Sequence, residues 1–186
     1  MTDEQIREYA ESRRFHPQTL ARWLGWDEAD RDALFRIAYG LKVGENHLRD
    51  LLDWLEEIAG RDGSPVRDVL ASRGIIETET DPRLGRADKL KRIKEQIRRL
   101  RFPRLARTED AIRERIQELK LQPEIRLSVA PGLEGGALQV AFQSSDAAEF
   151  ERLAGKLLQA ADKDAVKEIF RLLSGEAASA EAKADA

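Results

Sequence analysis

The sequence predicts a mostly α-helical protein, with an N-terminal helical domain, a basic linker helix and a small C-terminal α+β unit. Two observations predict this fold class. Apolar residues recur three or four positions apart through most of the first 120 residues, which is typical of amphipathic helices. The period then changes to two over residues 125–129 and 138–142, which flank a glycine-rich stretch. That pattern is typical of a β-hairpin with one apolar face.

The composition limits the class of protein. A chain of 186 residues forms one domain or two small ones, and 41% hydrophobic residues are enough for a core. The absence of cysteine excludes disulfides, thiolate catalysis and cysteine zinc sites, and favours an intracellular protein. No apolar run approaches the roughly 18 residues that a membrane span needs, and the polar, acidic start is unlike a signal peptide. We therefore expect a cytoplasmic protein with no membrane partner.

The first two elements are predicted to be helices, residues 3–11 and 17–24, joined by the tight turn Arg13-Arg14-Phe15-His16. This is the outline of a helix-turn-helix, a unit that places one helix end in the DNA major groove. The inner faces of the pair are expected to consist of Ile6, Tyr9, Ala10, Phe15, Leu20, Trp23 and Leu24.

The outer face of the second helix is predicted to contact DNA. Gln18, Thr19 and Arg22 are expected to point outward near its N-terminus, and these residue types hydrogen-bond base edges. Arg13 and Arg14 lie in the turn, where we expect them to contact phosphates. Arg14 departs from the motif, which often has glycine at this position. The alternative is a plain helical hairpin whose outer face is polar.

Three further helices complete the predicted N-terminal domain, residues 1–74. Asp27 caps the first, whose acidic first turn suits the helix dipole. Asn46 caps the second, which has a leucine-rich face, and Ser64-Pro65 begins a short third helix. The next residues are polar and without periodicity, which predicts a domain boundary within residues 74–88.

The charge distribution identifies a second candidate DNA-binding segment. Residues 1–80 have a net charge of −6, residues 81–107 of +8 and residues 108–186 of −5. Residues 75–107 are interpreted as a linker followed by a basic helix that Pro103 must interrupt. An alternative interpretation is a solvated helix face that pairs with acidic neighbours such as Glu56 and Glu57. The cations expected to contact phosphates, with salt-sensitive affinity, are Lys91, Arg92, Arg98, Arg99 and Arg101.

Residues 108–174 are predicted to form an α-β-β-α unit. Thr108 caps a helix, the hairpin follows, and Ser145 or Asp146 caps the helix after it. A last helix then ends near Leu173. The tail, residues 175–186, has no large apolar side chain and is expected to be disordered. No internal repeat is evident along the chain.

The hairpin also predicts a homodimer through residues 108–174. An isolated two-stranded hairpin is marginally stable in water, and its edges expose unpaired backbone groups. Pairing with the hairpin of a second chain would give a four-stranded sheet covered by helices. A two-fold dimer then places two recognition helices on two DNA half-sites. The alternative is a monomer whose own flanking helices cover the hairpin.

Two stretches resemble ParB-type partition proteins. Residues 40–52 are similar to the Gly-x-Leu-x-x-Gly-His-Ala segment that follows the helix-turn-helix in that family, with Glu45 and Asn46 inserted before His47 and with Leu48 in place of alanine. Residues 125–158 resemble the family's C-terminal dimerisation unit. The resemblance implies a dimeric core that binds double-stranded DNA. The chain contains no arginine-rich Gly-Glu-Arg-Arg motif, so the resemblance implies no nucleotide switch.

No catalytic motif is found in the sequence. It contains no Gly-x-Gly-x-x-Gly segment and no phosphate loop, and the two histidines, His16 and His47, have no metal-ligand spacing. We therefore expect no enzyme activity, no cofactor and no metal. The predicted function is DNA binding of the partition or transcriptional-regulator type. The alternative is a non-enzymatic protein-interaction adaptor with a helical docking domain, which the acidic surface of residues 1–80 favours.

Overall fold

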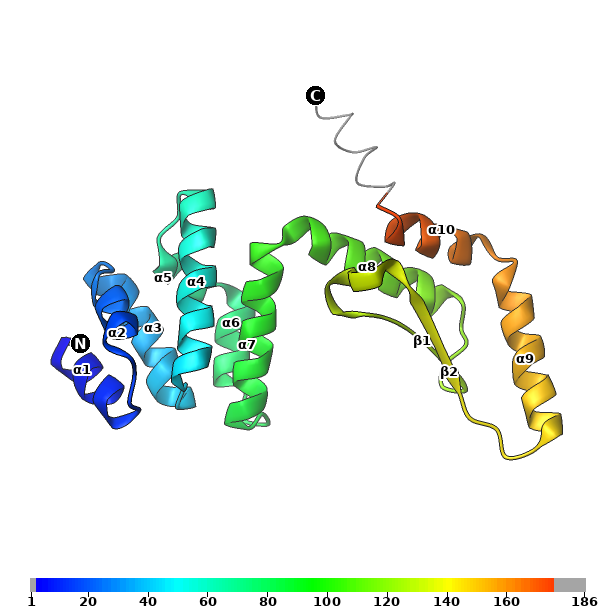
Figure 1. Ribbon diagram of the computed structural model, residues 1–186, viewed down its shortest axis with the longest axis horizontal. Helices are drawn as coiled ribbons and strands as arrows, with labels where there is room; N and C mark the ends of the chain where they lie inside the picture. Colours follow the sequence, from blue (N-terminus) through cyan, green and yellow to red (C-terminus); the bar gives the residue numbers. More distant parts are fainter. Residues whose placement is uncertain (1–2, 176–186) are drawn as a thin grey trace, which may run out of the picture. The chain divides into compact units, whose positions relative to one another are not determined.

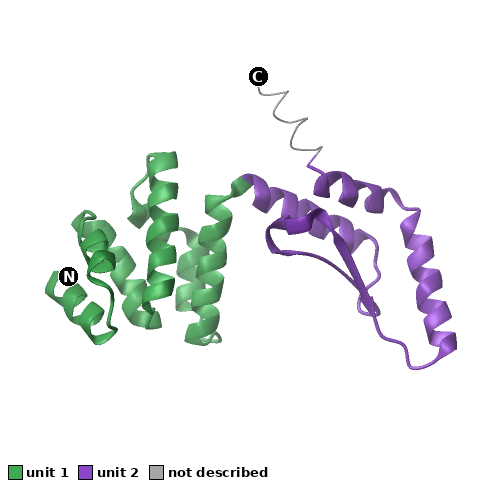
Figure 2. Ribbon diagram, viewed as in Figure 1, with its two compact units in different colours: residues 1–103 green, residues 104–186 purple. Residues whose placement is uncertain are grey.

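The computed structural model describes residues 3–175 of the chain. The chain divides into two compact units, residues 1–103 and 104–186 (Figure 2). The described residues are mostly helical, with one two-stranded antiparallel sheet, which confirms the predicted fold class (Figure 1). Within residues 3–175, no helix combines the length and the apolar composition that crossing a membrane requires.

From Asp3 onward, the described residues of the first unit form helices joined by turns and form no strand. In chain order they are α1 (Asp3–Ser12), α2 (Pro17–Leu24), α3 (Glu28–Leu41), α4 (Glu45–Asp62), α5 (Val66–Leu70), α6 (Arg73–Thr80) and α7 (Arg86–Arg101). One apolar core joins them, and α4 is central to it because Leu48, Leu51, Leu52, Leu55 and Ile58 are all buried.

The turn between α1 and α2 is built on a left-handed residue. Arg14 has φ of +56°, and the backbone amide of Phe15 donates to the carbonyl of Ala10 at 2.9 Å. The amide of Arg14 donates to Glu11 at 3.0 Å, which completes the paired hydrogen bonds of a Schellman helix end. Arginine therefore adopts the conformation that glycine usually supplies, and its departure from the expected motif does not prevent the turn.

The same turn occurs a second time, 28 residues later. Lys42 has φ of +54° after α3, and the amide of Val43 donates to the carbonyl of Ala38 at 2.9 Å. Core side chains also occur in equivalent pairs 28 residues apart: Ile6 and Leu34, Tyr9 and Ile37, Ala10 and Ala38, Phe15 and Val43, Leu20 and Leu48, Trp23 and Leu51. All of them are buried except Leu20, which is partly buried.

The sequence interpretation that no repeat is present is therefore corrected for residues 6–51. The residues that repeat share burial and backbone geometry, and most of them differ in identity. The backbone hydrogen bonds and the positive φ of the two turns cannot be recognised from residue identity. The structural repeat is therefore not detectable as a sequence repeat.

One side chain fixes the two turns together. The buried hydroxyl of Tyr9 lies 2.8 Å from the carbonyl oxygens of both Ala38 and Val43, which flank the second turn. The guanidinium of Arg13 donates to the carbonyl of Lys42 and lies 5.9 Å from the centre of the Tyr9 ring. The end of α1 therefore holds the segment that begins α4.

Residues 75–88 are not the linker that the sequence indicated, because α6 and α7 pack into the first unit. Ile75 and Thr78 are buried on α6, as are Ile93 and Ile97 on α7. The side-chain amide of Gln96 donates to Thr78 at 3.0 Å. The polar run of residues 77–82 concealed this helix, since its packing depends on one large apolar side chain and on contacts with residues far along the chain.

Two predicted helix starts are also wrong. The N-cap of α4 is Gly44, so Asn46 lies inside the helix. Thr108 lies inside α8 (Pro103–Glu118), where its hydroxyl bonds to the carbonyl of Arg104 at 3.2 Å. Pro103 does interrupt the basic helix as predicted, because it suits the first position of a new helix.

The second unit contains the hairpin. Strands β1 (Ile125–Val129) and β2 (Leu138–Phe142) pair antiparallel, with Leu127 opposite Val140, and are joined through η1 (Pro131–Gly136). Helices α9 (Ala147–Ala161) and α10 (Asp164–Leu173) follow, and Asp146 caps α9 by accepting from the amide of Glu149 at 2.8 Å. Apart from Gly175, the tail expected to be disordered lies outside the described residues.

We predict that Tyr9→Phe lowers the free energy of unfolding by about 1–2 kcal/mol at neutral pH, because buried carbonyls lose their donor. Burial raises the pKa of Tyr9 above its usual value near 10. The tyrosine's contribution is thus complete below about pH 10 and is lost as the pH rises further. Urea unfolding from pH 7 to 11 measures both effects.

The matched control is Tyr39→Phe, because Tyr39 is 64% exposed. It should leave stability and its alkaline pH dependence nearly unchanged. Equal effects from the two variants would contradict the role given to the Tyr9 hydroxyl.

Candidate nucleic-acid interface

The outer face of α2 presents Gln18 but not Thr19. Gln18 is exposed, whereas Thr19 is 7% exposed and donates its hydroxyl to Glu45 at 2.9 Å. Thr19 stands one helical turn before Trp23, which is completely buried, so both side chains share the inner face. The prediction that Thr19 faces outward is wrong for this reason.

Glu45 joins the start of α2 to the start of α4. Its carboxylate accepts from the amide of His16 at 2.8 Å as well as from Thr19. The hydrogen bond from the His16 amide, followed by that from Thr19, lowers the pKa of Glu45. His16 caps α2 in turn, because its Nδ1 accepts from the amide of Gln18. The N-termini of the two helices are therefore held side by side.

Arg22 faces outward, as expected, but its guanidinium is engaged by two carboxylates of α4. It lies 2.5 Å from Asp53 and 2.6 Å from Glu56, and hydrogen bonding to Glu56 raises the pKa of Arg22. Glu56 also accepts from the indole N–H of Trp26 at 2.8 Å. Arg22 is consequently fixed in place and its charge is neutralised within the protein.

A polar groove of about 360 Å³ lies on the surface where α2 and α4 meet. Gln18 and Arg22 line it from α2, and Arg49 lines it from α4. Arg49 is exposed and did not figure among the residues predicted from sequence. No local sequence signal identifies Arg49, because its place in the groove depends on the packing of α4 beside α2.

The basic helix α7 is partly neutralised by α4 and by its own residues. Lys94 lies 2.6 Å from Asp50, Arg101 lies 2.5 Å from Glu57, and Arg98 lies 2.8 Å from Glu95. Arg99 is partly buried. These contacts agree with the alternative interpretation of a helix paired with acidic neighbours, including Glu57 as anticipated. Glu56 pairs with Arg22 instead.

Several predicted phosphate contacts remain at the surface. Lys91 and Arg92 are exposed on α7, and Arg14 is exposed at the first turn. Arg13 is exposed too, although its guanidinium donates to the carbonyl of Lys42. The cations that were predicted to contact DNA thus form two groups, one exposed at the surface and one engaged by carboxylates of the protein.

The described residues offer no clear centre for metal chemistry, since nowhere in residues 3–175 do three or more histidine, aspartate and glutamate side chains gather as metal ligands would. Comparison of the chain with protein-family models, with curated proteins and with solved structures finds no match. The function proposed below is therefore argued from the residues and their geometry.

We predict that acid weakens the junction between α2 and α4. Because the folded-state pKa of Glu45 is lowered, its contribution to stability is present above its unfolded value near 4.5 and is lost as the pH falls below it. Glu45→Gln should reduce stability at pH 7 and flatten the loss between about pH 5 and 3. Thermal unfolding across this range provides the measurement.

Glu4→Gln is the control, because Glu4 is exposed on α1. A wild-type acid profile that Glu45→Gln leaves unchanged would show that Glu45 does not link the two helices.

Proposed function

We propose that the protein binds double-stranded DNA as a homodimer, with the α2–α4 groove facing the DNA. The observation that carries this proposal is the tight left-handed turn at Arg14, which joins two short helices and leaves Gln18 exposed at the start of the second. A helix-turn-helix uses this arrangement to bring the N-terminal residues of its second helix to base edges.

Base contacts are assigned to Gln18 and Arg49. They line one groove from two adjacent helices, and glutamine and arginine form paired hydrogen bonds with adenine and guanine respectively. Arg22 was predicted from the sequence to contact bases, and a different role is assigned to it here. By pairing with Asp53 and Glu56 beside the groove, it offsets one of their two negative charges and so reduces the repulsion that they would exert on phosphates.

Phosphate contacts are assigned to exposed cations, namely Arg14, Lys91 and Arg92. Each cation that neutralises a phosphate releases counterions, so affinity falls as salt rises. Arg98 and Arg101 contribute less in this proposal than in the sequence prediction, because Glu95 and Glu57 already engage them.

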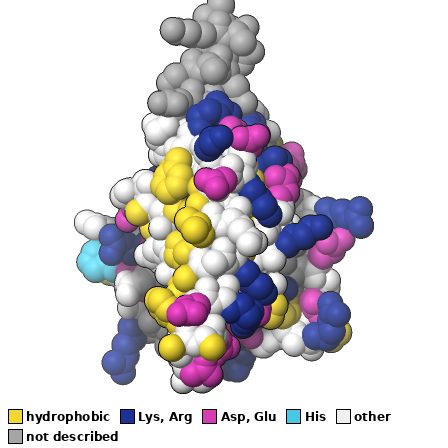
Figure 3. Space-filling model, turned by 90° about the vertical axis from the view of Figure 1, so that its right-hand side faces the viewer, with side chains coloured by type: hydrophobic (Ala, Val, Ile, Leu, Met, Phe, Trp, Pro, Cys, Tyr) yellow, Lys and Arg dark blue, Asp and Glu magenta, His cyan; other side chains and the backbone are white. Residues whose placement is uncertain are grey.

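The homodimer is assigned to an uncovered apolar surface of the second unit. Val140 shares a sheet face with the buried Leu127, its cross-strand partner, yet is 44% exposed. Phe150 and Leu158 are 52% and 71% exposed and lie two helical turns apart on α9. Seen from the side of α9, hydrophobic side chains form a column bordered by charged ones (Figure 3). A second copy would cover this surface and the free strand edges.

The resemblance to ParB-type partition proteins adds the biological setting of this proposal, either partition or transcriptional regulation. In this chain the corresponding segment, Gly40-Leu41-Lys42-Val43-Gly44, spans the second left-handed turn and leads into α4. A second candidate function is a protein-interaction adaptor, which the groove between α4 and α7 described below favours.

We predict that Gln18→Ala and Arg49→Ala each relax the preference at one or two base pairs, costing about 1–3 kcal/mol of discrimination. Selection from a random pool of duplexes of about 30 base pairs, long enough for two half-sites, measures the preference. Arg7→Ala is the control, since Arg7 is exposed on α1 and does not line the groove. Unchanged preferences in both groove variants would refute the assignment.

A second DNA prediction concerns salt. Replacing Lys91 and Arg92 by alanine should weaken binding to every sequence and lower the slope of log affinity against log salt by roughly one per side chain. Fluorescence anisotropy between about 50 and 200 mM salt supplies the slope. The double variant Lys120→Ala, Lys163→Ala removes two exposed cations of the second unit and should change it little. A slope that is the same in all three proteins would contradict the phosphate assignment.

For the dimer, we predict that Leu158→Glu converts it to a monomer, because a buried unpaired charge costs several kcal/mol. Light scattering gives the mass and circular dichroism the helix content. Gln159→Glu introduces the same group at the adjacent exposed position and should remain dimeric. A monomeric wild type would end the proposal of dimerisation.

A further inference from the structure

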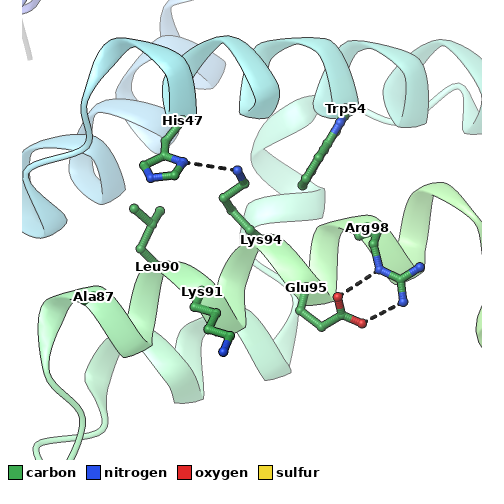
Figure 4. A pocket seen from close by; sticks show the side chains of 8 residues that line it. All are labelled: His47, Trp54, Ala87, Leu90, Lys91, Lys94, Glu95 and Arg98. Atoms are coloured by element: carbon green, nitrogen blue, oxygen red, sulfur yellow. Dashed lines mark hydrogen bonds and ion pairs between the residues drawn. The ribbon is translucent and has the colours of Figure 1, made fainter. Parts of the chain in front are cut away.

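A second groove, of about 530 Å³, runs between α4 and α7 in the first unit (Figure 4). Trp54 of α4 and Ala87 and Leu90 of α7 provide its apolar lining. Trp54 and Leu90 also pack on the core beneath, so this lining is rigidly supported. The volume lies within the range of about 300–1,000 Å³ that is usual for binding sites.

Cations surround the apolar lining. Lys91, Lys94 and Arg98 line the groove together with one carboxylate, Glu95. The ammonium of Lys94 lies 5.0 Å from the centre of the Trp54 ring, 3.2 Å from Nδ1 of His47 and 2.6 Å from Asp50. Figure 4 shows Lys94 between His47 and Trp54, and the pair formed by Glu95 and Arg98 beside them. With Asp50 included, three cations face two carboxylates, and Lys91 is the cation of the lining that neither Asp50 nor Glu95 engages.

The groove has the length of a short helix. Its α7 lining extends from Ala87 to Arg98, which at about 1.5 Å per residue is roughly 16 Å, or three helical turns. Helical ligands dock in such grooves through apolar residues spaced three, four and seven positions apart. A helix of three turns presents two or three of these anchors along one face.

We propose that this groove binds an amphipathic acidic helix of a partner protein, whose apolar residues contact Trp54 and Leu90 while a carboxylate faces Lys91. Charge complementarity selects this occupant. The chain's own acidic segment after Gly175 has no large apolar side chain to serve as an anchor. This groove is separate from the α2–α4 groove, although it shares Lys91 with the proposed phosphate contacts.

Single-stranded nucleic acid fits the groove less well. Base stacking needs a succession of accessible aromatic faces. The groove provides two aromatic rings, those of Trp54 and His47, and the ammonium of Lys94 already contacts both. Its mostly apolar lining suits leucine or isoleucine side chains better than a phosphate backbone.

The test uses the full chain and a fluorescein-labelled peptide of about 14 residues, helical by design, with leucines at positions i, i+3 and i+7 and glutamates on both flanks. Two matched peptides replace the glutamates by lysines or the leucines by alanines. A single-stranded oligonucleotide is the nucleic-acid arm. We expect fluorescence anisotropy to detect binding of the acidic leucine peptide and of none of the other three.

The decisive variants are neighbours on α7. Lys91 lines the α4–α7 groove, whereas Arg92 lines the groove between α6 and α7, so the same charge reversal is made on two faces. Lys91→Glu should weaken peptide binding at least tenfold, and Arg92→Glu less than twofold. Trp54→Ala should weaken it similarly to Lys91→Glu, with circular dichroism confirming that the helices remain.

Failure of the acidic peptide to bind, equal binding of the lysine peptide, or equal weakening by Lys91→Glu and Arg92→Glu overturns the proposal. Binding of the oligonucleotide that Trp54→Ala abolishes also overturns it, in favour of a nucleic-acid groove. Titration with duplex DNA separates the two proposals: Trp54→Ala, which removes no charge, should weaken peptide binding alone, whereas Lys91→Glu should weaken binding of both peptide and duplex.

Discussion

The first unit depends on the contact between the Tyr9 hydroxyl and the two carbonyls that flank the second turn. This contact connects residues about 30 positions apart and sets where α1 ends relative to where α4 begins. The hydrogen bonds from His16 and Thr19 to Glu45 follow from it, since they require the same two helix starts to be adjacent. The position of the α2–α4 groove thus depends on the geometry of the two turns, which place the starts of α2 and α4 next to each other.

The electrostatics of this unit are largely internal. Residues 1–103 contain 20 Lys/Arg and 20 Asp/Glu, so the acidic and basic segments of the sequence compensate each other. Helix α4 provides the carboxylates of these ion pairs: Asp53 and Glu56 pair with Arg22 of α2, and Asp50 pairs with Lys94 of α7. Both grooves lie beside this acidic helix. The charge that a ligand contacts in each groove depends on which cations remain exposed beside the carboxylates of α4. Lys91 and Arg49 are two of these exposed cations.

Periodicity was enough to predict the helices around Ile6 and Trp23 and both strands of the hairpin, because local side-chain patterns determine them. The same spacing, applied to Thr19, places it on the inner face one turn before Trp23, so the outward prediction departed from the pattern. Periodicity was not enough for α6, whose packing depends on residues of α7. Ion pairs such as Arg22 with Asp53 join positions about 30 apart and left no local trace. The predicted site residues therefore fall into two groups. Some remain at the surface, and others form ion pairs and hydrogen bonds that stabilise the fold.

The two left-handed corners have a consequence for how this surface tolerates change. Glycine would form either corner with less conformational strain, by roughly 1 kcal/mol. Arginine and lysine at these places instead carry a positive charge on a long, flexible side chain at an exposed corner. Substitution by glycine would keep the architecture and remove the charge. Mutational drift at these corners is therefore able to alter ligand preference while leaving the core intact.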